Sequence, residues 1–194
     1  TVTVIPAVFA DAGADTSVCL NSGSFSLTSG SPPGGSWNGS MVNPAGVFSP
    51  TTPGVHTVYY SYGMGTCLTE DSVEITVHDL PVADAGQDTL MCENDSIQLN
   101  GSAFGGLPSY SFTWSPANSL NTTNGSSVYA SPSVNEIYKL QVEDANGCFD
   151  SSFVAVEVKE LPDINANDLN LCIGDSGIIN TTINGNGPYN FNWS

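Results

Sequence analysis

The sequence has almost no positive charge. Lys139 and Lys159 stand against 19 Asp and Glu residues, arginine is absent, and the formal net charge is −17. Such a surface repels nucleic acid and anionic membranes, which excludes nucleic-acid binding, and the sequence has no apolar run long enough for membrane insertion. Because 40% of the residues are hydrophobic, the chain is nevertheless predicted to fold around compact cores and is unlike a disordered acidic tail.

Residues and motifs typical of catalysis are also scarce. His56 and His78 are the two histidines, and Asn135 occupies the position that matches His56 in the next repeat. The sequence contains no nucleophile elbow, HExxH motif or phosphate-binding loop. It therefore predicts a protein that is not an enzyme.

A ten-residue phrase occurs three times, at 10–19, 83–92 and 163–172, and each copy ends in cysteine. A Val-rich run closed by proline precedes each copy, and these prolines are separated by 75 and then 81 residues. A period of this length holds a complete small domain, unlike the short units of solenoids. The predicted organisation is the end of a preceding repeat (1–6), a first repeat (7–81), a second repeat (82–162) and part of an incomplete third repeat (163–194).

Helix formers are sparse, and the apolar residues alternate. The segments 110–114, 137–142 and 153–158 have the period of two that is typical of antiparallel strands, and the DANG sequence at 144–147 predicts a tight hairpin. Each repeat also places a tryptophan after its first cysteine, which indicates a core residue of an immunoglobulin-like sandwich. The predicted fold is all-β, with tandem immunoglobulin-like β-sandwiches arranged head to tail. The predicted core tryptophans are Trp37, Trp114 and Trp193.

Five cysteines distribute as two in each complete repeat and one in the third. The simplest pairing is Cys19–Cys67 and Cys92–Cys148, with Cys172 bonded to a partner outside the chain. If the cysteines of one repeat lie at opposite poles of its sandwich, they would link neighbouring repeats instead, and the sequence leaves that alternative open. Either arrangement indicates an oxidising, extracellular compartment.

Carboxylates gather around the two predicted joints between repeats. Calcium is bound by six to eight oxygen atoms, so these side chains predict a calcium site that stiffens a joint. The alternative is that they are solvated residues that form turns. The residues are Asp11, Asp15, Asp79, Asp84, Asp88, Glu160, Asp163 and Asp168.

The YSFTW segment at 110–114 and the YKLQVEDANGC segment at 138–148 carry a family resemblance. The chain resembles the Ig-like or PKD-like tandem repeats of giant Bacteroidota surface proteins that are exported by the type IX secretion system. That family includes gliding-motility adhesins and predatory surface filaments. The resemblance implies a location at the cell surface, and it implies O-glycosylation at three hydroxyl residues that follow aspartate, namely Ser72, Thr89 and Ser96.

The resulting functional hypothesis is a structural or adhesive segment of a long extracellular fibre. Its predicted partners are neighbouring repeats of the same chain, identical chains in a filament, and surface glycans or prey or host cells. One alternative is a self-assembling filament subunit. Another is a glycan-binding or protein-binding module, for which the aromatic residues to inspect are Tyr59, Tyr62, Phe104 and Tyr129.

Overall fold

The computed structural model describes residues 8–185, 187, 188, 190 and 192. These residues contain no α-helix, and their only helical element is the 3₁₀ turn η1 (Gly65–Cys67). The strands are β1 (Thr16–Cys19), β2 (Phe25–Ser26), β3 (Ser36–Gly39), β4 (Val47–Phe48), β5 (Gly54–Tyr62), β6 (Thr69–His78), β7 (Pro81–Asp84), β8 (Thr89–Cys92), β9 (Ile97–Asn100), β10 (Ser102–Gly105), β11 (Ser111–Ser115), β12 (Ser127–Ala130), β13 (Glu136–Glu143), β14 (Phe149–Lys159), β15 (Asp163–Ala166) and β16 (Thr181–Asn184).

The first sandwich packs a sheet of order β1-β6-β5-β3 with the short pair β2–β4. Strand β1 runs parallel to β6, and the other pairs are antiparallel. Alternate residues of β5 and β6 point inward because successive side chains of a strand face opposite sides of the sheet. Their buried members surround Trp37, which lies opposite Tyr60 in the β3–β5 register. The buried core consists of Ala12, Trp37, Phe48, Val58, Tyr60, Val73, Ile75 and Val77.

The second sandwich repeats this plan. Its larger sheet has the order β11-β13-β14-β8, with β8 parallel to β14, and β9–β12 and β7–β10 are its smaller two-stranded sheets. Trp114 lies opposite Leu140, which is the register position that Trp37 and Tyr60 occupy in the first sandwich. Gly101 separates β9 from β10, and a Cβ atom there would overlap the side chain of Leu140. The buried core has eleven members: Ala85, Met91, Leu99, Trp114, Val128, Ala130, Tyr138, Leu140, Val142, Val154 and Val156.

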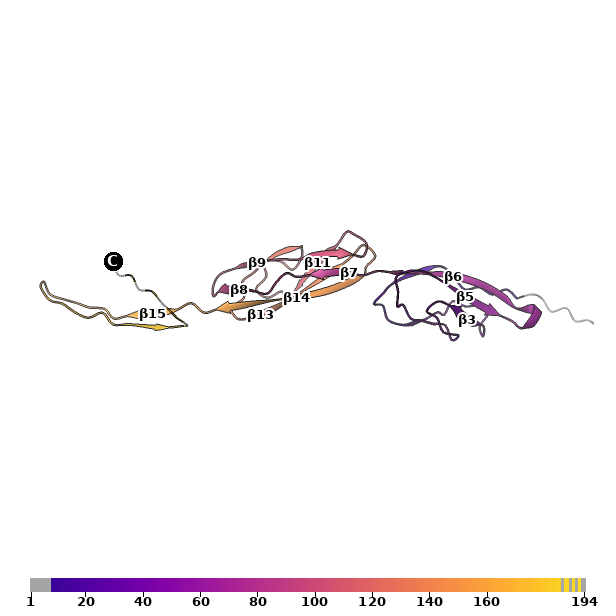
Figure 1. The fold of residues 1–194 in the computed structure, drawn as a ribbon, viewed down its shortest axis with the longest axis horizontal. Coiled ribbons are helices and arrows are strands. Elements are labelled where there is room, and N and C mark those ends of the chain that lie inside the picture. The colour runs from indigo at the N-terminus through magenta and orange to yellow at the C-terminus, as the bar shows by residue number, and fades with distance from the viewer. Residues whose placement is uncertain (1–7, 186, 189, 191, 193–194) are drawn as a thin grey trace, which may run out of the picture.

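The third segment is the hairpin of β15 and β16, whose antiparallel register joins Asp163 to Asn184. It follows the second sandwich as β7 and β10 follow the first, and most of its residues are exposed. Figure 1 shows the two sandwiches and this hairpin in a row, which is the predicted head-to-tail arrangement of tandem β-sandwiches. The residue limits of the repeats remain predictions; strand β7 begins at Pro81, one residue before the predicted start of the second repeat.

The two separate cores lead to a first prediction. Trp114→Ala should destabilise the second sandwich by about 3–5 kcal/mol, because it removes a large side chain that is 1% exposed. Amide hydrogen exchange measured by mass spectrometry should accelerate in β13 and β14 and stay unchanged in β5 and β6. Trp37→Ala is the matched variant and should give the reverse pattern. A loss of protection in both sandwiches from either variant would show that the two cores are not independent.

Candidate functional site at the joint between the sandwiches

The repeated phrase builds the same turn in each sandwich. Asp11 Oδ1 accepts a hydrogen bond from the Gly13 amide at 2.8 Å, and Asp84 Oδ1 accepts one from the Gly86 amide at 2.9 Å. Both glycines have positive φ, 90° and 85°, a conformation that a side chain would strain. The first carboxylate of the phrase therefore closes a tight Asx turn.

The second carboxylate of the phrase fastens one strand to another. Asp15 Oδ1 accepts from the Glu74 amide at 2.9 Å, and Asp88 Oδ1 accepts from the Ala155 amide at 2.8 Å. This bond joins the segment before β1 to the long strand β6 in the first sandwich, and the segment before β8 to the long strand β14 in the second. Asp15 and Asp88 thus stabilise their own sandwiches.

The eight acidic residues predicted to bind calcium are not brought together. Asp79 accepts from its neighbour Leu80, and Asp163 accepts from the Asn165 side chain. Within the part of the chain that the structure describes, no group of three or more His, Cys, Asp or Glu residues could hold a metal ion. Six of the eight carboxylates accept hydrogen bonds within the protein, those of Asp11, Asp15, Asp79, Asp84, Asp88 and Asp163. A calcium ion at a joint remains a prediction.

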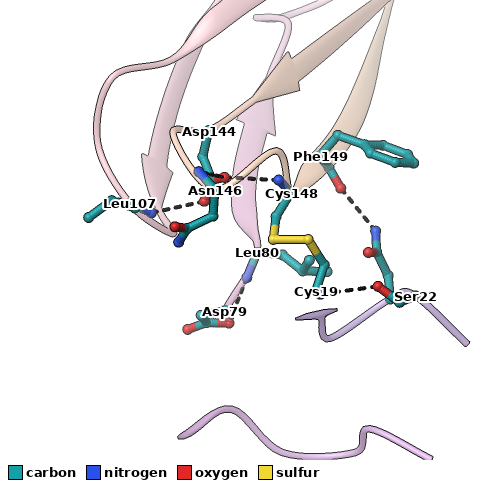
Figure 2. Close-up of a disulfide and its surroundings, with 10 residues drawn as sticks. Cys19, Ser22, Asp79, Leu80, Leu107, Asp144, Asn146, Cys148 and Phe149 are labelled. Carbon is teal, nitrogen blue, oxygen red and sulfur yellow. Dashed lines mark hydrogen bonds between the residues drawn. A yellow bond between two sulfur atoms is a disulfide. The ribbon is translucent and has the colours of Figure 1, made fainter. Parts of the chain in front are cut away.

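One disulfide crosses the joint. Cys19, the last residue of β1, is bonded to Cys148, which lies in the turn between β13 and β14; their Cα atoms are 5.5 Å apart and 129 residues apart in sequence. The predicted pairs Cys19–Cys67 and Cys92–Cys148 are therefore wrong, and the alternative, a link between neighbouring repeats, is what forms. Figure 2 shows this bond with the residues around it.

The strand lengths explain why the predicted pairs cannot form. Cys19 lies beside His78 at the end of β6, whereas Cys67 comes just before β6 begins. Since β6 has ten residues, the two cysteines are separated by about 30 Å, far beyond the reach of roughly 7 Å between the Cα atoms of a disulfide. Strand β14 separates the cysteines of the second sandwich in the same way, over 11 residues.

Hydrogen bonds surround the disulfide. The side-chain amide of Asn21 donates to the Phe149 carbonyl at 3.1 Å, so the turn after β1 also holds the strand that begins after Cys148. Ser22 Oγ accepts from the Cys19 amide at 3.1 Å and orders the same turn. The sequence analysis did not identify Asn21. One signal for it was present in the sequence, since an asparagine stands two residues after the cysteine in both repeats, Asn21 after Cys19 and Asn94 after Cys92.

Asp144 organises the other side of the joint. It is 5% exposed, and its carboxylate accepts from the backbone amides of Leu107, Asn146 and Cys148, each at 2.9 Å. Burial by itself would raise the pKa of Asp144, but these three donors and the nearby His78 together hold that pKa below its usual value. The ionised carboxylate thus fixes the turn that carries Cys148.

The other predicted site residues lie apart from this joint. Cys67, Cys92 and Cys172 are unpaired and exposed in the described part of the chain. Ser72 and Ser96 are exposed and Thr89 is half-buried, so two of the three predicted glycosylation residues are open to solvent. Trp37 and Trp114 are 5% and 1% exposed inside the cores, and Trp193 lies outside the described residues.

The four aromatic residues selected for a binding role differ in exposure. Tyr59, Phe104 and Tyr129 are exposed, and Tyr62 is half-buried. They lie on β5, β10 and β12, in two different sandwiches. They do not all belong to one surface.

No family model matches the chain, and no curated protein matches it. Among solved structures, extracellular domains 3–5 of Drosophila OTK match at 15% identity over 75% of this chain and 59% of that chain, with a TM-score of 0.38. The N-terminal eight Ig domains of DSCAM match at 13% identity over 78% and 25%, with a TM-score of 0.42. The titin fragment I67–I69 matches at 18% identity over 79% and 66%, with a TM-score of 0.37. At TM-scores below 0.5, these matches assign neither a family nor a function.

No helix among the described residues is long and apolar enough to cross a membrane.

The buried carboxylate gives a prediction about pH. Because the pKa of Asp144 is lower in the folded state, its stabilisation is complete above the unfolded-state pKa of about 3.9 and is lost as the pH falls through the folded-state pKa. Asp144→Asn places an amide group beside the Leu107 amide donor and should cost about 1.5–3 kcal/mol at pH 7.

Urea unfolding at several pH values, monitored by hydrogen exchange in β13 and β14, measures the free energy of unfolding of the second sandwich. The difference in free energy of unfolding between the natural chain and Asp144→Asn should shrink below pH 4. Asp79→Asn, at an exposed carboxylate of the same joint, is the control and should change little. An equal difference at pH 7 and pH 2 would contradict the role of the Asp144 charge.

Proposed function

We propose that the chain is a load-bearing structural segment of a long extracellular bacterial surface protein, in which consecutive sandwiches are held in line as a stalk or adhesive fibre. The observation that carries this proposal is the disulfide between Cys19 and Cys148, because it joins one sandwich directly to the next. Such a link holds the facing poles of the two sandwiches together when the chain is pulled.

The route of tension through the chain supports this role. A pull on the two ends reaches Cys19 from one side and Cys148 from the other, and the disulfide then carries it across the joint. The residues between the two cysteines form a closed loop that tension cannot straighten. That loop contains most of the first sandwich and the strands β7 to β13 of the second.

Two further observations support an extracellular bacterial location. A disulfide between sandwiches is stable in an oxidising compartment and is reduced in most cytosols. The YSFTW and YKLQVEDANGC segments resemble repeats of Bacteroidota proteins exported by the type IX secretion system, and Ser72 and Ser96 in the glycosylation pattern of those proteins are exposed.

Single-molecule stretching of the full chain by its two ends tests the load-bearing role. Complete unfolding of the natural, oxidised chain should give a contour shorter by about 450 Å than that of Cys19→Ser, since 129 residues at roughly 3.5 Å each are released when the link is absent. Cys67→Ser removes an unpaired, exposed cysteine and should keep the shorter contour. Equal contours for the natural chain and Cys19→Ser would refute the proposed path of tension.

A second function, a binding module, is favoured by one surface. Leu90, Ile137 and Phe153 are each 61% exposed, and the strands that carry them, β8, β13 and β14, are neighbours in one sheet. In the register, Ile137 lies opposite Ala155 and Leu90 opposite Glu157, so the three apolar side chains share one face with both residues. Exposed apolar residues grouped in this way are typical of contact surfaces.

A glycan array tests whether this face binds a glycan, and mass photometry tests whether it joins copies of the chain. A binding module should capture a glycan and lose it in Phe153→Ser, and a filament subunit should show oligomers of the chain that the same substitution dissociates. Tyr59→Ser, at an exposed aromatic residue of the other sandwich, is the control. A monomer that binds no glycan and does not respond to Phe153→Ser would rule out glycan binding and self-assembly through this face.

A further inference from the structure

Two unpaired cysteines occupy the same places as the two halves of the disulfide. Cys92 is the last residue of β8, as Cys19 is the last residue of β1. Cys67 lies in the connection between β5 and β6, as Cys148 lies in the connection between β13 and β14. Each sandwich therefore carries one cysteine of each kind, at its two opposite poles.

The backbone around Cys92 matches that around Cys19. Cys19 pairs with His78 in the parallel register, and Cys92 pairs with Lys159. The amide of the following residue donates to the carbonyl of that partner in both cases, at 3.0 Å for Leu20 and 2.8 Å for Glu93. The second sandwich thus presents Cys92 at its far pole as the first sandwich presents Cys19.

The turn after each cysteine is also the same. The Ser22 amide donates to the Cys19 carbonyl at 3.0 Å, and the Asp95 amide donates to the Cys92 carbonyl at 3.2 Å. Within these turns, Asn94 stands where Asn21 binds the Phe149 carbonyl across the joint. The second sandwich therefore carries the same asparagine as well as the same cysteine.

The pole that carries Cys92 also has space beside it. An open hollow follows the end of β14, and it is lined in part by Glu93, Val134, Asn135, Val158 and Leu161. The linker is equally long at both joints, because Pro81 follows His78 by three residues and Pro162 follows Lys159 by three. A repeat that continues after Pro162 with the fold of the second sandwich would bring its β13–β14 turn to this place.

We propose that Cys92 forms a disulfide with the turn cysteine of a following repeat of this type, and Cys67 with the strand-end cysteine of a preceding one. The partner at each pole is a further copy of the same repeat, bound through the contacts seen between Cys19 and Cys148. The link across the joint then recurs along a covalently cross-linked series of sandwiches.

The chemistry of each new link is an oxidation of two thiols. One cysteine thiolate attacks a disulfide oxidant such as oxidised glutathione and releases one glutathione thiol. The partner cysteine, after losing its proton, displaces the second glutathione. The protein gains one sulfur–sulfur bond, and the oxidant takes up the two electrons and two protons as two thiols.

This inference depends on the repeated geometry of the joint and not on the load-bearing role. The cysteines can pair in a protein that carries no tension, and the Cys19–Cys148 link can carry tension when Cys92 stays reduced. The stretching experiment and the experiment below therefore fail independently of each other.

The test supplies the missing partner. In the full chain, residues 82–162 are inserted a second time directly after Pro162, which keeps the natural linker at the new joint. The chain is oxidised in a glutathione buffer, unpaired thiols are alkylated, and the bonds are mapped by mass spectrometry of unreduced peptides. We expect Cys92 of the first copy to be bonded to Cys148 of the inserted copy, as completely as Cys19 is bonded to Cys148 of the first copy.

The same chain contains its own control. Cys92 of the inserted copy is followed only by the β15–β16 segment, so it should remain alkylated, as should Cys67 and Cys172. If Cys92 of the first copy is alkylated as fully as that of the inserted copy while Cys19–Cys148 forms, the proposal is overturned.

A second chain keeps the proposal testable if the first does not fold. It repeats residues 7–81 directly after Pro81, which sets Cys19 of the first copy against Cys67 of the second. A disulfide between these two residues supports the proposal. Complete alkylation of both, in a chain whose remaining Cys19–Cys148 bond has formed, overturns it for Cys67.

Discussion

The parallel pairing of a short strand with the last strand of each sandwich is the constraint on which the joint depends. Strand β1 runs beside the end of β6, and β8 runs beside the end of β14. The register pairs Cys19 with His78 and Cys92 with Lys159, the last residues of β6 and β14. The cysteine that closes each short strand therefore lies at the pole where the chain leaves the sandwich. The turn cysteine lies at the opposite pole because the last strand starts there.

Many aspartates of this acidic chain complete backbone hydrogen bonds. Asp11 and Asp84 close turns, Asp15 and Asp88 join strands, and Asp144 holds three amides at the joint. Isolated peptide amides in loops are costly to bury without an acceptor, and a carboxylate satisfies several at once. The phrase thus recurs because each sandwich needs the same turn, whatever the joint binds.

The fold could be predicted from the sequence because the patterns that indicate strands and cores are local. Alternating residues such as those of β13 and the tryptophan at one point of each repeat determine strands and cores through side-chain direction alone. The disulfide partners were not predictable, because two pairings are equally compatible with two cysteines per repeat until strand lengths separate Cys19 from Cys67. The calcium prediction assumed that acidic residues close in sequence to a joint also face it. Asp15 and Asp88 instead bind backbone amides of their own sandwiches.

The disulfide also changes what a protease can do to this chain. Cys19 and Cys148 enclose the linker, Asp79 and Leu80 included, and the exposed loops of both sandwiches between them. A single cut anywhere in that interval opens the loop but leaves its two ends joined through the sulfur atoms. A segment exposed to secreted proteases would therefore remain one continuous molecule after a cleavage that would divide an ordinary chain of domains into two.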